Sequence, residues 1–221
     1  MDQDFLKEVS AQLRKPSGEF GNEIAQRMNE SNLRMNLDTI NSLKIEDDHT
    51  VLEIGMGNGF FIKEILSKAN KVKYIGCDYS EDMVALSTEM NQTFIDSGQA
   101  TFHLSEAHHL PTDNSSIDHL FTINTIYFWN DIPTLLSEFK RVLKPNGTLA
   151  ISLRPEGCLR QFPSTQYNFT YYNAEQVSEI LKAHGFSVKQ IIEVTEPEME
   201  VMKKHLIPEF AILLAHKTST N

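Results

Sequence analysis

The sequence predicts an α/β fold, with a three-layer sandwich built on a mostly parallel seven-stranded sheet and a helical cap at the N-terminus. Three observations predict it. From residue 50 onward, apolar strand patterns alternate with amphipathic helix patterns, the order typical of a parallel sheet covered by helices on both faces. A glycine-rich turn joins the first strand to the first helix of this region. The last two strand patterns lack a convincing helix between them, which favours an antiparallel C-terminal hairpin.

Residues 1–45 are expected to form the helical cap, ahead of a core at 46–221. Apolar residues at helical spacing predict one amphipathic helix over 2–14 and a further helical stretch from 24 to 40. The connection at 15–21 contains a proline and two glycines, which end the first helix. This connection, with Met28 and Asn29, forms either a hinged lid over the site or a plain helix–helix link.

Each core element follows from its local pattern. Ser80 is a candidate N-cap for the helix that follows the second strand, and Asn173 with Gln176 is a candidate capping box for the last helix. Residues 154–172 are expected to be an irregular, aromatic-rich segment, and 195–208 to hold at most a short helical piece. Strands are expected over 50–55, 72–77, 100–104, 117–123, 148–153, 186–194 and 209–216.

Composition narrows the class of protein. The chain has 221 residues, 40% hydrophobic and 23% charged, which suits a globular α/β protein with a sizeable core. Its formal net charge of −10 argues against a nucleic-acid partner, which usually requires a basic surface. The apolar runs are too short to cross a bilayer, and the N-terminus lacks the pattern of a signal peptide. Two cysteines form no disulfide framework, so the expected location is cytoplasmic.

The most informative segment is the first strand with the turn that follows it. Gly55, Gly57 and Gly59 stand at every second position, where the lack of a Cβ lets the backbone turn sharply and lets a ligand approach it. The helix beyond them offers N–H groups and partial positive charge. Asp78 ends the next expected strand, and its carboxylate, an acceptor, suits the hydroxyls of a ribose. These features together indicate a site for a nucleoside cofactor.

The spacing of the glycines discriminates between cofactors. The dinucleotide fingerprint G-x-G-x-x-G places its last glycine where this chain has Phe60, and the third glycine comes one residue early. The pattern is E-x-G-x-G-x-G, beginning at Glu53, and it resembles motif I of the class I S-adenosylmethionine (SAM) dependent methyltransferases. In that family the carboxylate lies near the methionine end of the cofactor.

Three later segments carry the same resemblance. Leu104-Ser105-Glu106-Ala107 is similar to the family's D-A step, whose carboxylate meets the adenine amino group while the next N–H meets a ring nitrogen; here Glu106 replaces Asp. Asp118–Asn124 is similar to the fourth motif, whose last residue sits where cofactor and substrate meet. Leu143–Leu149 is similar to the L-K-P-G-G segment, with Asn146 in place of a glycine. The overall shape resembles the small-molecule branch that includes ubiquinone- and menaquinone-pathway methyltransferases.

The resemblance implies a Rossmann-like fold, SAM as cofactor and methyl transfer to a small molecule by in-line displacement. It places the glycines under the methionine part of SAM, Glu53 at its amino-acid end and Asp78 on the ribose. Tyr79 and Met83 would enclose the adenine, and Asn124 would lie beside the sulfonium. The implied cofactor-binding residues are Glu53, Gly55, Gly57, Gly59, Asp78, Tyr79, Met83, Glu106, Ala107 and Asn124.

The acceptor side is less defined, and no catalytic residue is assigned. Tyr127, Phe128 and Trp129 offer aromatic faces to a cationic sulfonium, or pack the following helix. His108 and its neighbour His109 are either a base or two solvated histidines, and no third ligand at a metal spacing accompanies them, so no metal is expected. The pair Tyr171 and Tyr172 lines the substrate pocket or forms a core edge.

Other functions remain open at this stage. One is a SAM-binding or partner-binding module without catalysis, which would never form S-adenosylhomocysteine. Another is a methyltransferase of protein or RNA, which the acidic charge disfavours. A third is a nicotinamide-dependent oxidoreductase, which is disfavoured because Phe60 stands where the dinucleotide fingerprint has a glycine.

Overall fold

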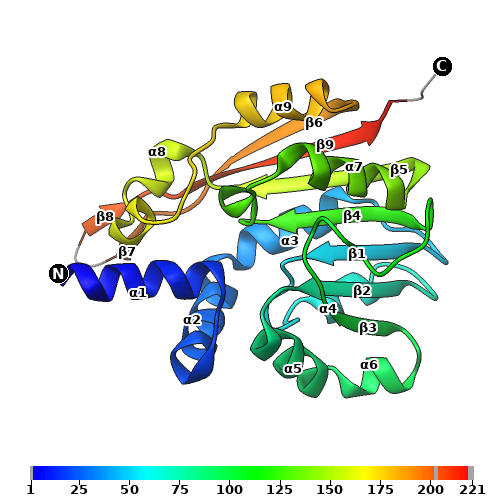
Figure 1. Ribbon diagram of the computed structural model, residues 1–221, viewed down its shortest axis with the longest axis horizontal. Helices are drawn as coiled ribbons and strands as arrows, with labels where there is room; N and C mark the ends of the chain where they lie inside the picture. Colours follow the sequence, from blue (N-terminus) through cyan, green and yellow to red (C-terminus); the bar gives the residue numbers. More distant parts are fainter. Residues whose placement is uncertain (1, 202–203, 219–221) are drawn as a thin grey trace.

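The computed structural model describes residues 2–201 and 204–218, and its main sheet has the predicted architecture (Figure 1). Among these residues seven strands pair in the order β3-β2-β1-β4-β5-β9-β6. The pairs from β3 to β5 are parallel, and β9 runs antiparallel between β5 and β6. The prediction of a mostly parallel sheet with an antiparallel C-terminal pair is therefore confirmed. The strands are β1 (Thr50–Ile54), β2 (Lys73–Asp78), β3 (Ala100–Leu104), β4 (Ile117–Ile123), β5 (Leu143–Leu153), β6 (Phe186–Thr195) and β9 (Glu209–Lys217).

Helices cover both faces of the sheet, and the side chains of β1 show how the layers form. Leu52 belongs to an apolar cluster with residues of α7 and α9, whereas Val51 belongs to a second cluster with residues of α3 and α4. Successive side chains of a strand point to opposite faces, so the two clusters are the cores of the two outer layers. The helices are α3 (Leu33–Ser42), α4 (Ile62–Leu66), α5 (Glu81–Met90), α6 (Gln92–Asp96), α7 (Ile132–Val142) and α9 (Ala174–Ala183).

Two predicted helix caps are present. The Ser80 hydroxyl accepts a hydrogen bond of 3.3 Å from the main-chain N–H of Met83 at the start of α5. At the start of α9, Asn173 and Gln176 form a reciprocal capping box with hydrogen bonds of 2.8 and 2.9 Å. Each cap satisfies N–H groups that a helix N-terminus leaves without a partner.

The N-terminal helices are packed against the rest of the fold, α3 on the sheet itself and α1 (Gln3–Arg14) on α2 (Gly18–Ser31) and on residues after β5. The residues after β5 that α1 contacts form the 3-10 turn η2 (Pro163–Gln166). Helix α3 contributes Met35 and Ile40 to the apolar cluster of the sheet. The division into a cap at 1–45 and a core at 46–221 stays a prediction. Residue 1 of the cap and residues 202–203 and 219–221 of the core lie outside the described residues.

Two segments differ from the sequence-based expectation. Residues 195–208 contain an antiparallel strand pair, β7 (Met199–Val201) and β8 (Lys204–Leu206), instead of a helical piece. The expectation of at most a short helical piece agrees with the absence of a helix among the described residues of this segment, but the strand pair was missed because strands of three residues are too short to show a period of two. The segment 154–172 is not wholly irregular, since it contains the short helix α8 (Glu156–Leu159) and η2. There the Thr165 hydroxyl donates to the carbonyl oxygen of Leu159, at 2.7 Å, and folds the segment back on itself.

Candidate functional site

The glycine-rich loop after β1 has the backbone that its sequence predicts. Gly55, Gly57 and Gly59 have positive φ angles of 74°, 57° and 66°, in the left-handed region that favours glycine. A Cβ on Gly55 would lie 2.5 Å from a methyl carbon of Thr125, and one on Gly59 would lie 3.0 Å from Asn91 and Ser87. A Cβ on Gly57 would meet no atom within 4 Å. Packing thus requires the outer two glycines, and the middle one presents bare backbone to open space.

Asp78, at the carboxyl end of β2, faces this loop. One carboxylate oxygen accepts the main-chain N–H of Gly57 at 3.0 Å, and the other accepts that of Ser80 at 2.9 Å. Burial raises the pKa of this carboxyl, and the N–H groups around it oppose that rise because they favour the charged form. A carboxylate oxygen has capacity for more than one donor, so both oxygens can still accept ligand hydroxyls.

Glu53 lies beneath the loop, on β1. It is buried, and its carboxylate accepts a hydrogen bond of 2.6 Å from the hydroxyl of Tyr74 on β2. Burial raises the pKa of Glu53 to about 7, with the Tyr74 hydrogen bond lowering it and the charge of Asp78 raising it further. Two acidic groups with raised pKa values therefore lie at neighbouring positions around Gly57. This concentration is typical of a ligand site.

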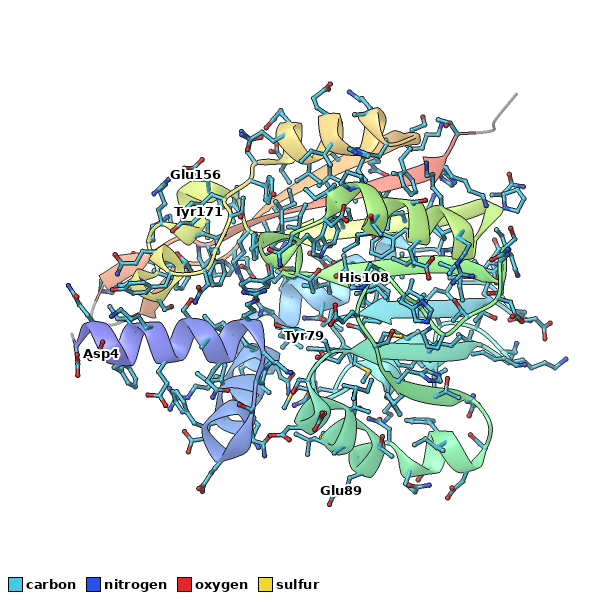
Figure 2. All side chains as sticks on the ribbon, in the orientation of Figure 1. Asp4, Tyr79, Glu89, His108, Glu156 and Tyr171 are labelled. Carbon is cyan, nitrogen blue, oxygen red and sulfur yellow. The ribbon has the colours of Figure 1, made fainter. Side chains whose placement is uncertain are left out.

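The connection between α1 and α2 is docked on the loop that follows Asp78, and Figure 2 shows Tyr79 between the N-terminal helices and the sheet. The Tyr79 hydroxyl donates to the carbonyl oxygen of Arg14, and the Ser80 hydroxyl donates to that of Pro16 at 2.5 Å. The N–H of Gly18 donates to Asp82 at 2.6 Å. Three hydrogen bonds thus join the connection and the adjoining ends of α1 and α2 to the β2–α5 loop and the start of α5. Its opening as a lid stays a prediction.

The two residues expected to enclose an adenine differ in exposure. Tyr79 is half-buried, and the ammonium of Lys15 lies 5.4 Å from the centre of its ring. Met83 is completely buried, so its side chain packs among protein atoms beneath the site. Their roles toward a ligand stay predictions.

The loop after β3 holds the next group of predicted residues. Glu106 is exposed, Ala107 is half-buried, and both histidines that follow are exposed. His108 lies 3.4 Å from the Glu106 carboxylate. Figure 2 places His108 in front of the sheet, away from the N-terminal helices. Both side chains of the His108–Glu106 pair are exposed, so the contact holds His108 only weakly, and the role of His108 or His109 as a base stays a prediction.

Asn124 follows β4 and lies next to the glycine-rich loop. Its φ of 57° is left-handed, which is uncommon for a residue other than glycine. Its side-chain oxygen accepts a hydrogen bond of 2.8 Å from the Tyr127 hydroxyl. Its neighbour Thr125 contacts Gly55, so the two loops meet where the sequence predicted the reacting end of the cofactor.

The aromatic residues after Asn124 are mainly packed within the protein. Tyr127 is buried and stacks on Phe169, with ring centres 5.4 Å apart. Phe128 meets the same Phe169 edge to face at 4.7 Å. Trp129 packs against Phe139 of α7. These contacts favour the packing interpretation for Tyr127 and Trp129.

Tyr171 and Tyr172 line an open groove with residues at the start of α9. The Tyr171 hydroxyl donates to the carbonyl oxygen of Thr165 at 2.8 Å, and the guanidinium of Arg160 lies 4.3 Å from its ring centre. Figure 2 shows Tyr171 beside Glu156, apart from Tyr79. Neither Gly57 nor Asp78 lines this groove, and a role in a substrate pocket stays a prediction.

Sequence reasoning missed Arg154, which follows β5 at the same edge of the sheet. Its guanidinium is buried, pairs with Glu196 at 2.6 Å and donates to the carbonyl oxygen of Ser31 at 3.0 Å. Arg154 thereby joins β5, the segment after β6 and the end of α2. An arginine directly after an apolar strand was the available signal.

Two classes of site find no support among the described residues. Across residues 2–201 and 204–218, no group of three His, Cys, Asp or Glu side chains is placed to hold a metal ion. In the same part of the chain, no helix combines the length and the apolar character that crossing a membrane requires.

Comparison with known proteins agrees with this geometry. A family model described as a methyltransferase domain matches residues 52–151, which span β1 to β5. An O-methyltransferase of Pyrenophora dematioidea is 24% identical over 170 residues, covering 74% of this chain and 63% of that protein. An uncharacterized methyltransferase of Bacillus subtilis, YdaC, is 25% identical over 190 residues, covering 84% of this chain and 92% of its own. The chain thus spans somewhat less than two thirds of the first relative and nearly all of the second.

Solved structures show the same fold at lower identity. The methyltransferase in a complex with the Trm112 methyltransferase activator of Haloferax volcanii superposes with a TM-score of 0.77 at 15% identity, covering 96% of this chain and 99% of that one. A phosphoethanolamine N-methyltransferase of Haemonchus contortus, solved with phosphomonomethylethanolamine and S-adenosylhomocysteine, gives a TM-score of 0.65 at 19% identity. It covers 84% of this chain and 53% of that one.

Proposed function

We propose that this chain, which carries a class I SAM-dependent methyltransferase domain with SAM as methyl donor, transfers the methyl group of SAM to a small-molecule acceptor. The observation that carries the proposal is the pair formed by Gly57 and Asp78. The bare, left-handed backbone of Gly57 faces open space while its N–H fixes the Asp78 carboxylate. This arrangement provides both a surface for the ligand and acceptors for ribose hydroxyls.

The resemblance to class I methyltransferases suggests a role for each site residue, and the positions of Gly57 and Asp78 support it. Gly57, between the tightly packed Gly55 and Gly59, would support the methionine part of SAM. Glu53, below it, would face the ammonium group of SAM. Asp78 would accept the ribose hydroxyls, and Tyr79 would cover the adenine. We assign the cofactor to Glu53, Gly55, Gly57, Gly59, Asp78, Tyr79, Met83, Glu106, Ala107 and Asn124.

The protein's share of catalysis would be mainly alignment. SAM supplies an activated methyl group on a sulfonium, which is a good leaving group. Holding reactants in line can contribute about 7–11 kcal/mol to lowering a barrier. A base is required only where the acceptor must lose a proton first, and we assign none.

A small acceptor is supported by the surroundings of the site. The α1–α2 connection is docked over the β2–α5 loop beside Tyr79, which favours a small acceptor over a macromolecule. The formal charge of −10 disfavours an RNA substrate. The Haemonchus enzyme of the same fold was solved with a small amine acceptor. The expected likeness to quinone-pathway methyltransferases does not define the acceptor.

Isothermal titration calorimetry with SAM, S-adenosylhomocysteine and NAD tests the cofactor. We expect saturable binding of the first two and none of NAD. Absence of SAM binding would overturn the proposal, and binding of NAD alone would favour an oxidoreductase. Turnover is tested by S-adenosylhomocysteine formation with a panel of small oxygen, nitrogen, carbon and sulfur nucleophiles. A protein that binds SAM but never forms this product would be the catalytically silent binding module.

A further inference from the structure

Asn124 has a strained backbone at the centre of the site. A left-handed conformation in a residue other than glycine costs about 1–3 kcal/mol and persists only where the surroundings hold it. Such strain is concentrated at functional positions. Asn124 is anchored by its own main-chain N–H, which donates to the carbonyl oxygen of Ser152 at 2.9 Å, and by its side-chain amide, which lies 3.5 Å from the sulfur of Met35. Two further sets of hydrogen bonds hold the turn around it.

The first set joins the turn to the glycine-rich loop. The Thr122 hydroxyl donates to the carbonyl oxygen of Ile54 at 2.8 Å and lies 2.5 Å from the Thr125 hydroxyl. The indole N–H of Trp129 donates to Thr125 at 3.2 Å. Because Thr125 also contacts Gly55, this set fixes the turn against the glycine-rich loop.

The second set depends on the Tyr127 hydroxyl. It accepts the main-chain N–H of Arg154 at 2.6 Å, and its proton has two acceptors, the nearer being the side-chain oxygen of Asn124 at 2.8 Å and the other the carbonyl oxygen of Arg154 at 3.1 Å. Burial raises the pKa of Tyr127, so the group stays a neutral hydroxyl that can make both bonds. Stacking on Phe169 holds the ring independently of these bonds. Tyr127 thus links the end of β5 to Asn124.

We propose that Tyr127 is a positioning residue for the methyl-donor end of the site. Its hydroxyl holds Asn124 in the strained turn. It thereby fixes the turn beside Gly55, where the sulfonium and the acceptor would meet. This inference rests on the proposed function. It differs from an aromatic contact with the cofactor, because the hydroxyl acts through Asn124 and the ring is covered by protein.

The test compares SAM with S-adenosylhomocysteine, since only SAM carries the positive sulfonium and its methyl group. Tyr127→Phe removes the hydroxyl and keeps the stacked ring. We expect the dissociation constant of SAM to rise about threefold to tenfold, as for the loss of one hydrogen bond, and that of S-adenosylhomocysteine by less than about twofold. If the hydroxyl had a merely structural role, Tyr127→Phe would lower the unfolding temperature and weaken the binding of both ligands equally.

Two further variants sharpen the result. Thr165→Val removes another buried hydroxyl, whose bonds to the carbonyl oxygens of Leu159 and Phe162, at 2.7 and 2.9 Å, stay within the segment 154–172, and it should leave the ratio of the two affinities unchanged. Asn124→Gly accepts the left-handed backbone without strain and lacks the carboxamide, so adding Tyr127→Phe to it should change the ratio no further. If Tyr127→Phe alone does not fold, the double variant is compared with Asn124→Gly alone, and a further shift of the ratio in the double variant would overturn the inference.

The outcomes separate this inference from the proposed function. Wild-type protein that binds SAM, with an unchanged ratio in Tyr127→Phe and Asn124→Gly, would overturn the positioning role alone. Wild-type protein that binds neither ligand would overturn the proposed function and the inference with it. A ratio that shifts equally in Thr165→Val would show a general loss of rigidity and would also overturn the inference.

Discussion

The main-chain N–H of Gly57 donates a hydrogen bond of 3.0 Å to the Asp78 carboxylate, which joins the loop after β1 to the end of β2. The two residues are 21 positions apart, and parallel pairing of β1 with β2 brings them together. In a parallel sheet the carboxyl ends of neighbouring strands lie at one edge, where ligands of α/β proteins bind. The bond sets the position of the carboxylate before any ligand arrives.

The first prediction concerns Asp78. Asp78→Asn keeps the shape of the side chain but loses the charge and one acceptor, so SAM affinity should fall about tenfold to a hundredfold, the effect of a lost hydrogen bond to a charged group. Titration calorimetry measures it. Asp118→Asn is the matched control, because Asp118 also accepts a main-chain N–H but lies at the opposite edge of the sheet, beside Lys144. Equal losses in both variants would contradict the ribose assignment.

The second prediction compares two glycines with the same backbone and the same free space. Gly57 and Gly98 have φ of 57° and 71°, and a Cβ on either would meet no atom within 4 Å. Gly57→Ala and Gly98→Ala should each lower the free energy of unfolding by about 1–2 kcal/mol, the cost of a left-handed residue with a Cβ. Only Gly57→Ala should also weaken SAM binding, because its methyl group would occupy the expected floor of the cofactor site. Retained affinity in Gly57→Ala would remove the floor role.

The sequence was sufficient to predict a mostly parallel sheet with an antiparallel C-terminal pair, because strand and helix periods and the glycine turn are local signals. Strands β3 and β4 begin and end where they were predicted. The same holds for Gly57 and Asp78, which the pattern placed at one edge of the sheet. Local signals do not report which partner a side chain meets across the sheet.

The unpredicted parts depend on such long-range partners. Tyr74 bonds to Glu53 from a neighbouring strand, and Arg154 pairs with Glu196 across the edge of the sheet. The role of the Tyr127 hydroxyl was hidden because an aromatic residue after a strand suggests its ring face first. The short strands β7 and β8 carry too few residues for a period to be detected.

The third prediction concerns the pH dependence caused by Glu53. Its pKa rises from 4.5 to about 7 in the folded protein, so the folded state binds more protons than the unfolded state between these values. The stability that Glu53 contributes is fully present below pH 4.5 and is lost as pH rises to 7. Glu53→Gln should remove this loss, which urea unfolding of cofactor-free protein at pH 4.5 and 7.5 would show. A wild-type and variant difference that does not change with pH would contradict the raised pKa.

The last prediction concerns His119, which lies at the opposite edge of the sheet from the site. Its Nε2 is 3.0 Å from Nδ1 of His49, and its own buried Nδ1 has no hydrogen-bond partner. Burial lowers the pKa of His119 to about 4, with His49, His216 and Lys144 lowering it further and Asp118 opposing them.

His119 changes the free energy of unfolding with pH in the opposite direction to Glu53, and the two effects fall in overlapping pH ranges. Because the unfolded state binds the extra proton between pH 6.5 and 4, the stability that neutral His119 contributes is lost as pH falls through this range. The loss is at most about 3 kcal/mol, since one pKa unit corresponds to about 1.4 kcal/mol. In wild-type protein the Glu53 effect partly masks it. His119→Gln should therefore be relatively more stable than wild type at pH 4.5 than at pH 7, by urea unfolding at both values, and Glu53→Gln should show the steeper fall in acid. A His119→Gln profile parallel to that of wild type would show that this histidine does not titrate on unfolding.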